Sequence, residues 1–258
     1  MIPITTTAPR TGNYPVVIAL IVACVGVFLF QEQLTPRGQA WFIGEYALIP
    51  LRYASQRWAL MHGLDPDDYL PFLSMAFLHG GWLHLLFNMW TLWLFGRAVE
   101  ARLGSFRFTV LYVICALLAS GTHMLAYPGS QIPTLGASGA IAGVLGAHAM
   151  LYPRSQVVLV IPIVFIPLFF RVTALVYVAV WFGLQVFQGA GSLLLGGGQV
   201  AGIAWWAHIG GFLAGLVFVA ILAPPPPPAG EVPRGPWQDP QARRSAFDER
   251  RRPVWPDR

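Results

Sequence analysis

The sequence predicts an all-α, polytopic membrane protein with six transmembrane helices, a long structured first loop and a disordered C-terminal tail. Of its 258 residues, 56% are hydrophobic and only 10% are charged, with a mean hydropathy of +0.59. Soluble domains carry about 25% charged residues, so this composition excludes an ordinary soluble domain. Six apolar segments reach or approach the length of about 17 residues that crosses a bilayer. They lie at about 15–31, 81–99, 106–126, 136–152, 172–189 and 203–222.

The first span resembles a secretory signal at its start, because Arg10 precedes the apolar run Val16–Phe30. Gln31-Glu32-Gln33 follows in place of a small-residue cleavage site. We therefore expect that the first span is not cleaved off and that it follows a cytoplasmic segment, residues 1–14. The loop that follows, about residues 32–80, is rich in acidic, arginine and aromatic residues. Such composition is typical of a structured element at the membrane interface, and loops of this length are often functional.

Between spans four and five, the apolar run Val157–Phe170 is short and is interrupted by Pro162 and Pro167. We expect it to lie at the membrane interface, with a seven-span chain as the alternative. Residues 15–222 then form the membrane domain. The tail, 223–258, opens on consecutive prolines and continues with Arg, Asp and Pro, which is typical of a disordered segment.

Arginines are unevenly distributed between the loops. Arg97, Arg102 and Arg107 lie between spans two and three, and Arg154 and Arg171 between spans four and five. The loops after spans three and five carry none. Because arginine accumulates in cytoplasmic loops, both termini are expected in the cytoplasm. The same distribution accounts for the net charge of +5 without a nucleic-acid partner.

Polar residues of three spans lie at one expected depth, near the outer face. His84 and Asn88 fall in the first two turns of span two, Ser138 in the first turn of span four, and His208 in the second turn of span six. Spans one, three and five offer no comparable set, although His123 lies near the outer end of span three. Polar side chains in lipid usually face a partner or a water-filled cavity.

A serine hydroxyl needs a base to act as a nucleophile, and His208 is the candidate base for Ser138. Residues 101–230 contain no Asp or Glu. The later spans therefore offer no carboxylate that could complete a Ser-His-Asp triad. The same absence argues against the carboxylate relay of a proton-coupled transporter. We expect His208 to be held by packing and by Trp205 or Trp206.

Two small-residue patterns lie just after the candidate pair. Gly139-x-x-x-Gly143 and Gly211-x-x-x-Gly215 allow the backbones of two membrane helices to approach closely. We expect these patterns to bring spans four and six together.

Acyl transfer also needs hydrogen-bond donors for the developing oxyanion. His84 and Asn88 are four residues apart and so share a helix face. The backbone N–H of Ser138, at a helix start, is a third candidate donor. His79 is expected to brace the first loop or His84. Each residue alone has an ordinary structural interpretation, as packing motif, interfacial histidine or interhelical polar contact, and their joint occurrence favours a site.

Four motifs carry a resemblance to a known family: His79-Gly-Gly-Trp-Leu-His84-Leu-Leu-Phe-Asn88, Gly96-Arg97-Ala-Val-Glu100-Ala-Arg-Leu-Gly104, Gly136-Ala-Ser138-Gly139 and Ala207-His208-Ile-Gly-Gly211. Because the four motifs occur in this order and on these spans, the chain resembles the rhomboid intramembrane serine proteases of the basic six-span bacterial type. The resemblance covers roughly residues 15–222.

The resemblance implies a Ser138–His208 dyad and an oxyanion hole formed by His84, Asn88 and the Ser138 amide, with Gly136 close by. His79, Gly139 and Gly211 would support them. It also implies a water-filled cavity open to the outside and a capping loop at 189–198.

By this resemblance the protein would be a multi-pass protein of the bacterial inner membrane. Its partners would be the lipid bilayer and its substrates, single-span or polytopic membrane proteins. No metal, cofactor or nucleic acid is expected. The alternatives are a catalytically silent rhomboid-like protein that binds membrane clients, and a small channel or transporter.

Overall fold

The computed structural model describes residues 2–10, 12–163, 166–194 and 204–225. Its contacts divide the chain into two units, Met1–Ala223 and Pro224–Arg258. Only Pro224 and Pro225 of the second unit are described, so the predicted disorder of the tail falls outside the described residues.

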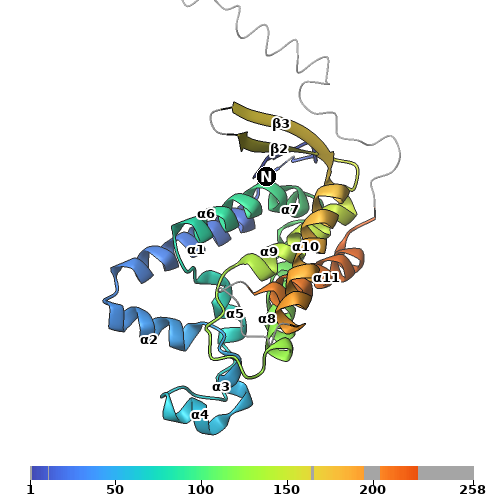
Figure 1. Ribbon diagram of the computed structural model, residues 1–258. Helices are drawn as coiled ribbons and strands as arrows, with labels where there is room; N and C mark the ends of the chain where they lie inside the picture. The colour runs from blue at the N-terminus through green and yellow to red at the C-terminus, as the bar shows by residue number, and fades with distance from the viewer. Residues whose placement is uncertain (1, 11, 164–165, 195–203, 226–258) are drawn as a thin grey trace, which may run out of the picture. The chain divides into compact units, whose positions relative to one another are not determined.

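The first unit is mostly helical (Figure 1). Its elements are, in chain order, β1 (Ile2–Thr6), α1 (Pro15–Gln33), α2 (Pro36–Tyr46), α3 (Pro50–Ala54), α4 (Gln56–Met61), α5 (Pro71–Ser74), the 3-10 turn η1 (Met75–Phe77), α6 (Trp82–Thr91), the π-helical turn η2 (Leu92–Gly96), α7 (Arg97–Leu103), α8 (Ser105–Ala126), α9 (Ser138–Leu151), β2 (Gln156–Ile163), β3 (Ile166–Thr173), α10 (Ala174–Leu194) and α11 (Trp205–Leu222).

Four of the described helices, α1, α8, α10 and α11, are long and apolar enough to cross a membrane. The apolar helix α9 is shorter, at 14 residues. The remaining expected span coincides with α6, η2 and α7, which follow one another without a break from Trp82 to Leu103. Each of the six apolar segments identified in the sequence therefore falls on a helix.

The expectation of an all-α protein is wrong in one region, since three strands form an antiparallel sheet of order β1-β2-β3. The run Val157–Phe170, which we expected to lie at the membrane interface, supplies most of the β2–β3 hairpin. Its β-branched residues favour extended structure. The segment before the first span is a strand as well, with Ile2 opposite Val160 and Thr6 opposite Val157. Figure 1 shows the sheet at the end of the unit opposite to α3 and α4.

The first loop is folded, as expected, and it is organised around one buried cation. The side chain of Arg52 is fully buried. It donates to the backbone carbonyls of Asp65 (2.8 Å) and Glu45 (3.1 Å) and to the carboxylate of Asp68 (3.2 Å). A buried guanidinium needs such partners because it cannot lose its charge. Arg52 thus ties α2, α3 and the segment before α5 together.

The core of the unit is the packing of α9 against α11. From Gly139 to Ala149, every residue of α9 is buried. A Cβ atom added at Gly211 would collide with the backbone oxygen of Gly139, and one added at Gly215 would collide with that of Gly143. The two glycine pairs identified in the sequence therefore face each other at backbone contact.

A second buried charge fixes the start of α1. The carboxylate of Glu100, on α7, accepts the backbone N–H groups of Val16 (3.0 Å) and Val17 (2.8 Å), and it also accepts the Ser105 hydroxyl (2.9 Å). The first N–H groups of a helix lack acceptors within the helix, and a carboxylate there is also favoured by the helix dipole. Glu100 therefore joins α1 to α7 and α8.

Replacing Gly215 by alanine is expected to lower the free energy of unfolding by about 1–3 kcal/mol, because an added methyl in a close-packed interior forces helices apart. Gly26→Ala in α1 is the matched control, since a Cβ there meets no atom within 4 Å. Unfolding measured in detergent micelles tests both variants. Equal stability of the two variants would contradict backbone contact between α9 and α11.

Glu100→Gln is expected to lower the free energy of unfolding by about 1–3 kcal/mol. The amide keeps one acceptor oxygen, and its NH2 group would face a second N–H donor. Glu32→Gln, an exposed position near the end of α1, should leave stability unchanged. The same unfolding measurement compares the two, and a neutral effect of Glu100→Gln would rule out the capping role.

Candidate active site

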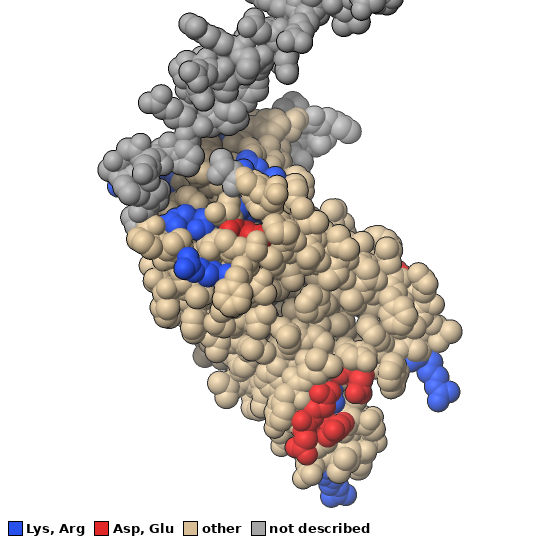
Figure 2. Space-filling view, turned by 180° about the vertical axis from the view of Figure 1, so that it is seen from behind, with Lys and Arg blue, Asp and Glu red and all other residues tan. Residues whose placement is uncertain are grey.

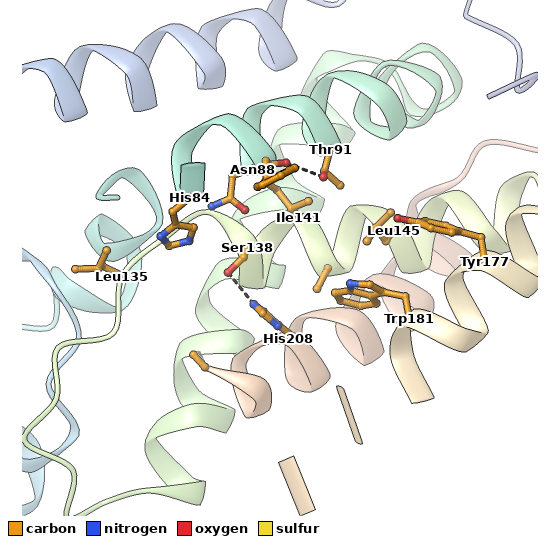
Figure 3. A pocket seen from close by; sticks show the side chains of 13 residues that line it. His84, Asn88, Thr91, Leu135, Ser138, Ile141, Leu145, Tyr177, Trp181 and His208 are labelled. Carbon is orange, nitrogen blue, oxygen red and sulfur yellow. Dashed lines mark hydrogen bonds between the residues drawn. The ribbon is translucent and has the colours of Figure 1, made fainter. Parts of the chain in front are cut away.

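A cavity of about 330 Å³ opens between α6, α9, α10 and α11 (Figure 3). Its wall carries both polar and apolar side chains. The lining residues are His84, Phe87, Asn88, Thr91, Leu135, Ser138, Ile141, Ala142, Leu145, Tyr177, Trp181, Ala204 and His208. All four polar residues that the sequence placed at one depth therefore line one cavity.

Ser138 and His208 are in direct contact, with 2.8 Å between the serine Oγ and the histidine Nε2 (Figure 3). Ser138 is the first residue of α9, and His208 lies in the first turn of α11, one turn earlier than expected. The first glycine contact between the two helices lies one residue after Ser138 and three residues after His208, and it sets the separation of this pair. This is hydrogen-bond distance, and it suits proton transfer from a hydroxyl to an imidazole.

The segment that leads to Ser138 is held by the first loop. Leu48 and Thr134 exchange two backbone hydrogen bonds, of 3.0 and 2.8 Å, and Gly136 donates its N–H to Met75 (2.8 Å). Gly136 has φ +124°, a conformation that favours glycine. A Cβ atom at this position would lie 2.7 Å from the imidazole of His84. Gly136 therefore serves both the turn before α9 and the close approach of His84.

His84 and Asn88 face the cavity from α6, beside Ser138 (Figure 3). Nδ1 of His84 accepts the N–H of Gly80 (3.4 Å), so Nε2 of a neutral imidazole carries the proton and is a donor. The side chain of Asn88 is buried, and its Nδ2 has no hydrogen-bond partner among the described residues. The site thus presents two side-chain donors to the cavity, and for that of Asn88 the described residues provide no acceptor.

His79 lies behind His84, with the two rings edge to face at 5.2 Å. The backbone of His79 is tied to α1, because its N–H donates to the side-chain oxygen of Gln31 and its carbonyl accepts from the same side chain, both at 3.2 Å. His79 therefore contacts His84 and also anchors the end of the first loop, the two alternatives that the sequence left open.

Span five, for which the sequence predicted no comparable set of polar residues, contributes one polar side chain to the site. The side chain of Gln185, on α10, is buried, and its Oε1 lies 2.7 Å from Nδ1 of His208. The sequence signal was present, because glutamine inside an apolar span is unusual. A glutamine carries no charge, and nothing in the sequence separates Gln185 from Gln188, one turn further on.

Of the two aromatic neighbours that the sequence offered for His208, Trp205 makes the contact. Trp205 lies edge-on to the imidazole at 6.4 Å, and Trp181 of α10 lies at 5.9 Å. Trp206 is not among the ring contacts described for His208. Trp181, which the sequence analysis did not single out, also lines the cavity.

The other histidines lie outside the cavity. His123 is buried and bonds Thr134 (2.9 Å), His148 is buried beside Ser155 (3.5 Å), and the exposed His62 bonds the carbonyl of Trp58 (2.7 Å). Among the residues that the structure describes, no group of three or more His, Cys, Asp or Glu side chains is arranged to hold a metal ion.

The expected capping loop, 189–198, begins later in the chain than we inferred. Residues 189–194 complete helix α10, which ends at Leu194. The rest of the expected loop, 195–198, falls outside the described residues.

Comparison with known proteins identifies the family of the chain. The rhomboid domain model matches residues 66–225, which include all of the cavity-lining residues. The chain is 28% identical over 205 residues to Rhomboid protein 1, mitochondrial, of Saccharomyces cerevisiae, covering 77% of this chain and 52% of that protein. It is 30% identical over 114 residues to the rhomboid protease GlpG of Klebsiella pneumoniae, covering 43% and 35%.

A third relative, the rhomboid protease GluP of Bacillus subtilis, is 43% identical over 75 residues, covering 29% of this chain and 14% of that protein. The matches span at most about half the length of these relatives. The domain match alone covers more than half of the chain described here. The chain is therefore a multi-pass membrane protein that belongs to the rhomboid family and is homologous to the rhomboid serine proteases.

Proposed function

We propose that the protein is an intramembrane serine endopeptidase that cleaves transmembrane segments of other membrane proteins through an acyl-enzyme formed on Ser138. The observation that carries this proposal is the 2.8 Å contact between Ser138 Oγ and His208 Nε2 inside a cavity of an otherwise apolar helical unit. Membership of the rhomboid family supports the same reaction class.

In this mechanism His208 is the general base. Nε2 takes the proton of Ser138 as Oγ attacks the scissile carbonyl, and a tetrahedral intermediate forms. His208 then gives that proton to the leaving amine as the C–N bond breaks. A water molecule enters, loses its proton to Nε2 and attacks the acyl-enzyme, and the second collapse releases Ser138.

The oxyanion would be held by Nε2–H of His84, by Nδ2–H of Asn88 and by the backbone N–H of Ser138. The proposal is supported by the buried Asn88 amide without a protein partner and by the bond that leaves His84 Nε2 protonated. Donors that are fixed before the reaction stabilise the developing charge without reorganisation. Gly136 lies against both side chains and leaves room for the oxygen.

We further propose six membrane spans, with both termini in the cytoplasm and the cavity near the outer face. In the face that Figure 2 shows, the largest acidic patch lies at one end of the first unit, with single basic side chains near it, and a group of arginines with a smaller acidic patch lies toward the opposite end. That second end carries α7 and the sheet.

Substrate helices must unwind locally, because their own hydrogen bonds hide the scissile carbonyl.

Ser138→Ala and His208→Ala are each expected to lower cleavage of a model transmembrane substrate at least about 10³-fold, since either change removes one member of the reacting pair. The assay uses the purified protein in detergent. His62→Ala, which changes an exposed histidine outside the cavity, should cleave normally.

A fluorophosphonate should label the wild type on Ser138 and leave Ser138→Ala unlabelled. Cleavage that persists undiminished in Ser138→Ala would refute the mechanism. A wild type that neither labels nor cleaves would favour a silent client-binding protein.

Asn88→Ala is expected to lower kcat about 10²- to 10³-fold with little change in KM, because an oxyanion donor acts mainly in the transition state. Asn13→Ala, an exposed asparagine before the first helix, is the control. Steady-state cleavage of the same substrate gives both constants. A rise in KM at constant kcat would instead place Asn88 in substrate binding.

A further inference from the structure

We propose that Gln185 is a positioning residue for His208, whose side-chain oxygen accepts the Nδ1–H of the imidazole and so keeps Nε2 free to accept the Ser138 proton. The inference rests on the proposed function, since it assigns a role within that site. Its basis is the 2.7 Å contact between Gln185 Oε1 and His208 Nδ1, made by a glutamine that is 6% exposed.

The contact lies in the middle of a continuous interface between α10 and α11. Before it, the rings of Phe182 and Phe212 stack with centroids 4.2 Å apart. After it, a Cβ atom at Gly189 would lie 3.3 Å from Ile209. Phe182, Gln185 and Gly189 are three and four residues apart and so share a face of α10. The large ring contact and the close approach at glycine hold the glutamine at a fixed distance from the base.

An acceptor at Nδ1 decides which nitrogen of the neutral imidazole carries the proton. The neutral ring has one N–H, and the nitrogen without it is the one that accepts a proton. With the N–H held at Nδ1 by Gln185, the lone pair lies at Nε2, which faces Ser138. The opposite tautomer would direct an N–H at the serine and block its activation.

The glutamine provides this acceptor without a charge. Residues 101–230 contain no carboxylate, and an ionised group in an apolar helical interior is costly. During the attack the Ser138 proton moves to Nε2, and Nδ1–H remains on the imidazolium and continues to donate to Gln185. No proton passes to the amide, so the residue orients the base and takes no part in the bond changes.

The first test separates kcat from KM. Gln185→Leu is expected to lower kcat about 10- to 100-fold, with KM within about twofold, because it leaves Nδ1–H without its acceptor. Gln185→Glu restores an acceptor and should recover most of the lost kcat. Gln188→Leu, an exposed glutamine on the same helix, should match the wild type. Gln185→Met, with nearly the same side-chain length, should behave as Gln185→Leu does.

The second test reads the tautomer directly by ¹⁵N NMR of imidazole-labelled protein in micelles, with His208→Ala to assign the signal. We expect His208 protonated at Nδ1 in the wild type and in Gln185→Glu, and a mixture of tautomers or mainly Nε2–H in Gln185→Leu. A low kcat with an unchanged tautomer, or a wild-type kcat in Gln185→Leu, would overturn the proposal. The NMR measurement needs no turnover, so inactivity of the wild type would count against the proposed function alone.

Discussion

The close approach of α9 and α11 is the constraint on which the rest of the structure depends. Gly139 and Gly211 lie at backbone contact, and so do Gly143 and Gly215. Such contact is open only to residues without side chains, and in lipid it replaces the hydrophobic driving force that packs helices in water. Ser138 directly precedes Gly139, and His208 lies three residues before Gly211. The packing of the two helices therefore also sets the 2.8 Å separation of Ser138 Oγ and His208 Nε2. The packing of the helices and the proposed chemistry therefore depend on the same few glycines.

Local sequence signals predicted the helices, and they failed where pairing is non-local. Apolar length identified every long helix, and two four-residue glycine spacings were enough to expect Ser138 beside His208. The sheet was missed because β1 is short, contains Pro3 and pairs with a strand far along the chain, so nothing near it in the sequence indicates its partner. Gln185 was missed for a related reason. The helical period places Gln185 and Gln188 close together on the helix surface, and it does not say which of the two side chains meets α11.

Few charged side chains are buried in the described part of this unit, and each of them is surrounded by hydrogen-bond partners. Arg52 organises the first loop, and Glu100 joins the start of α1 to α7. Both lie outside the cavity lining. With a neutral glutamine behind the base, proton transfer from Ser138 would create one positive and one negative charge side by side. The site as a whole then stays neutral, which suits surroundings of low dielectric constant better than a net charge does.

The pairing of β1 with β2 has a consequence for the order of events during synthesis. Ile2 pairs with Val160, and at translation rates of about 5–20 residues per second the first strand emerges on the order of 10 s before its partner. Throughout that interval its backbone groups have no strand to bond, while the helices between the two strands are still being made. The sheet can therefore close only after the first four apolar segments, which precede Val160 in the chain, have been synthesised.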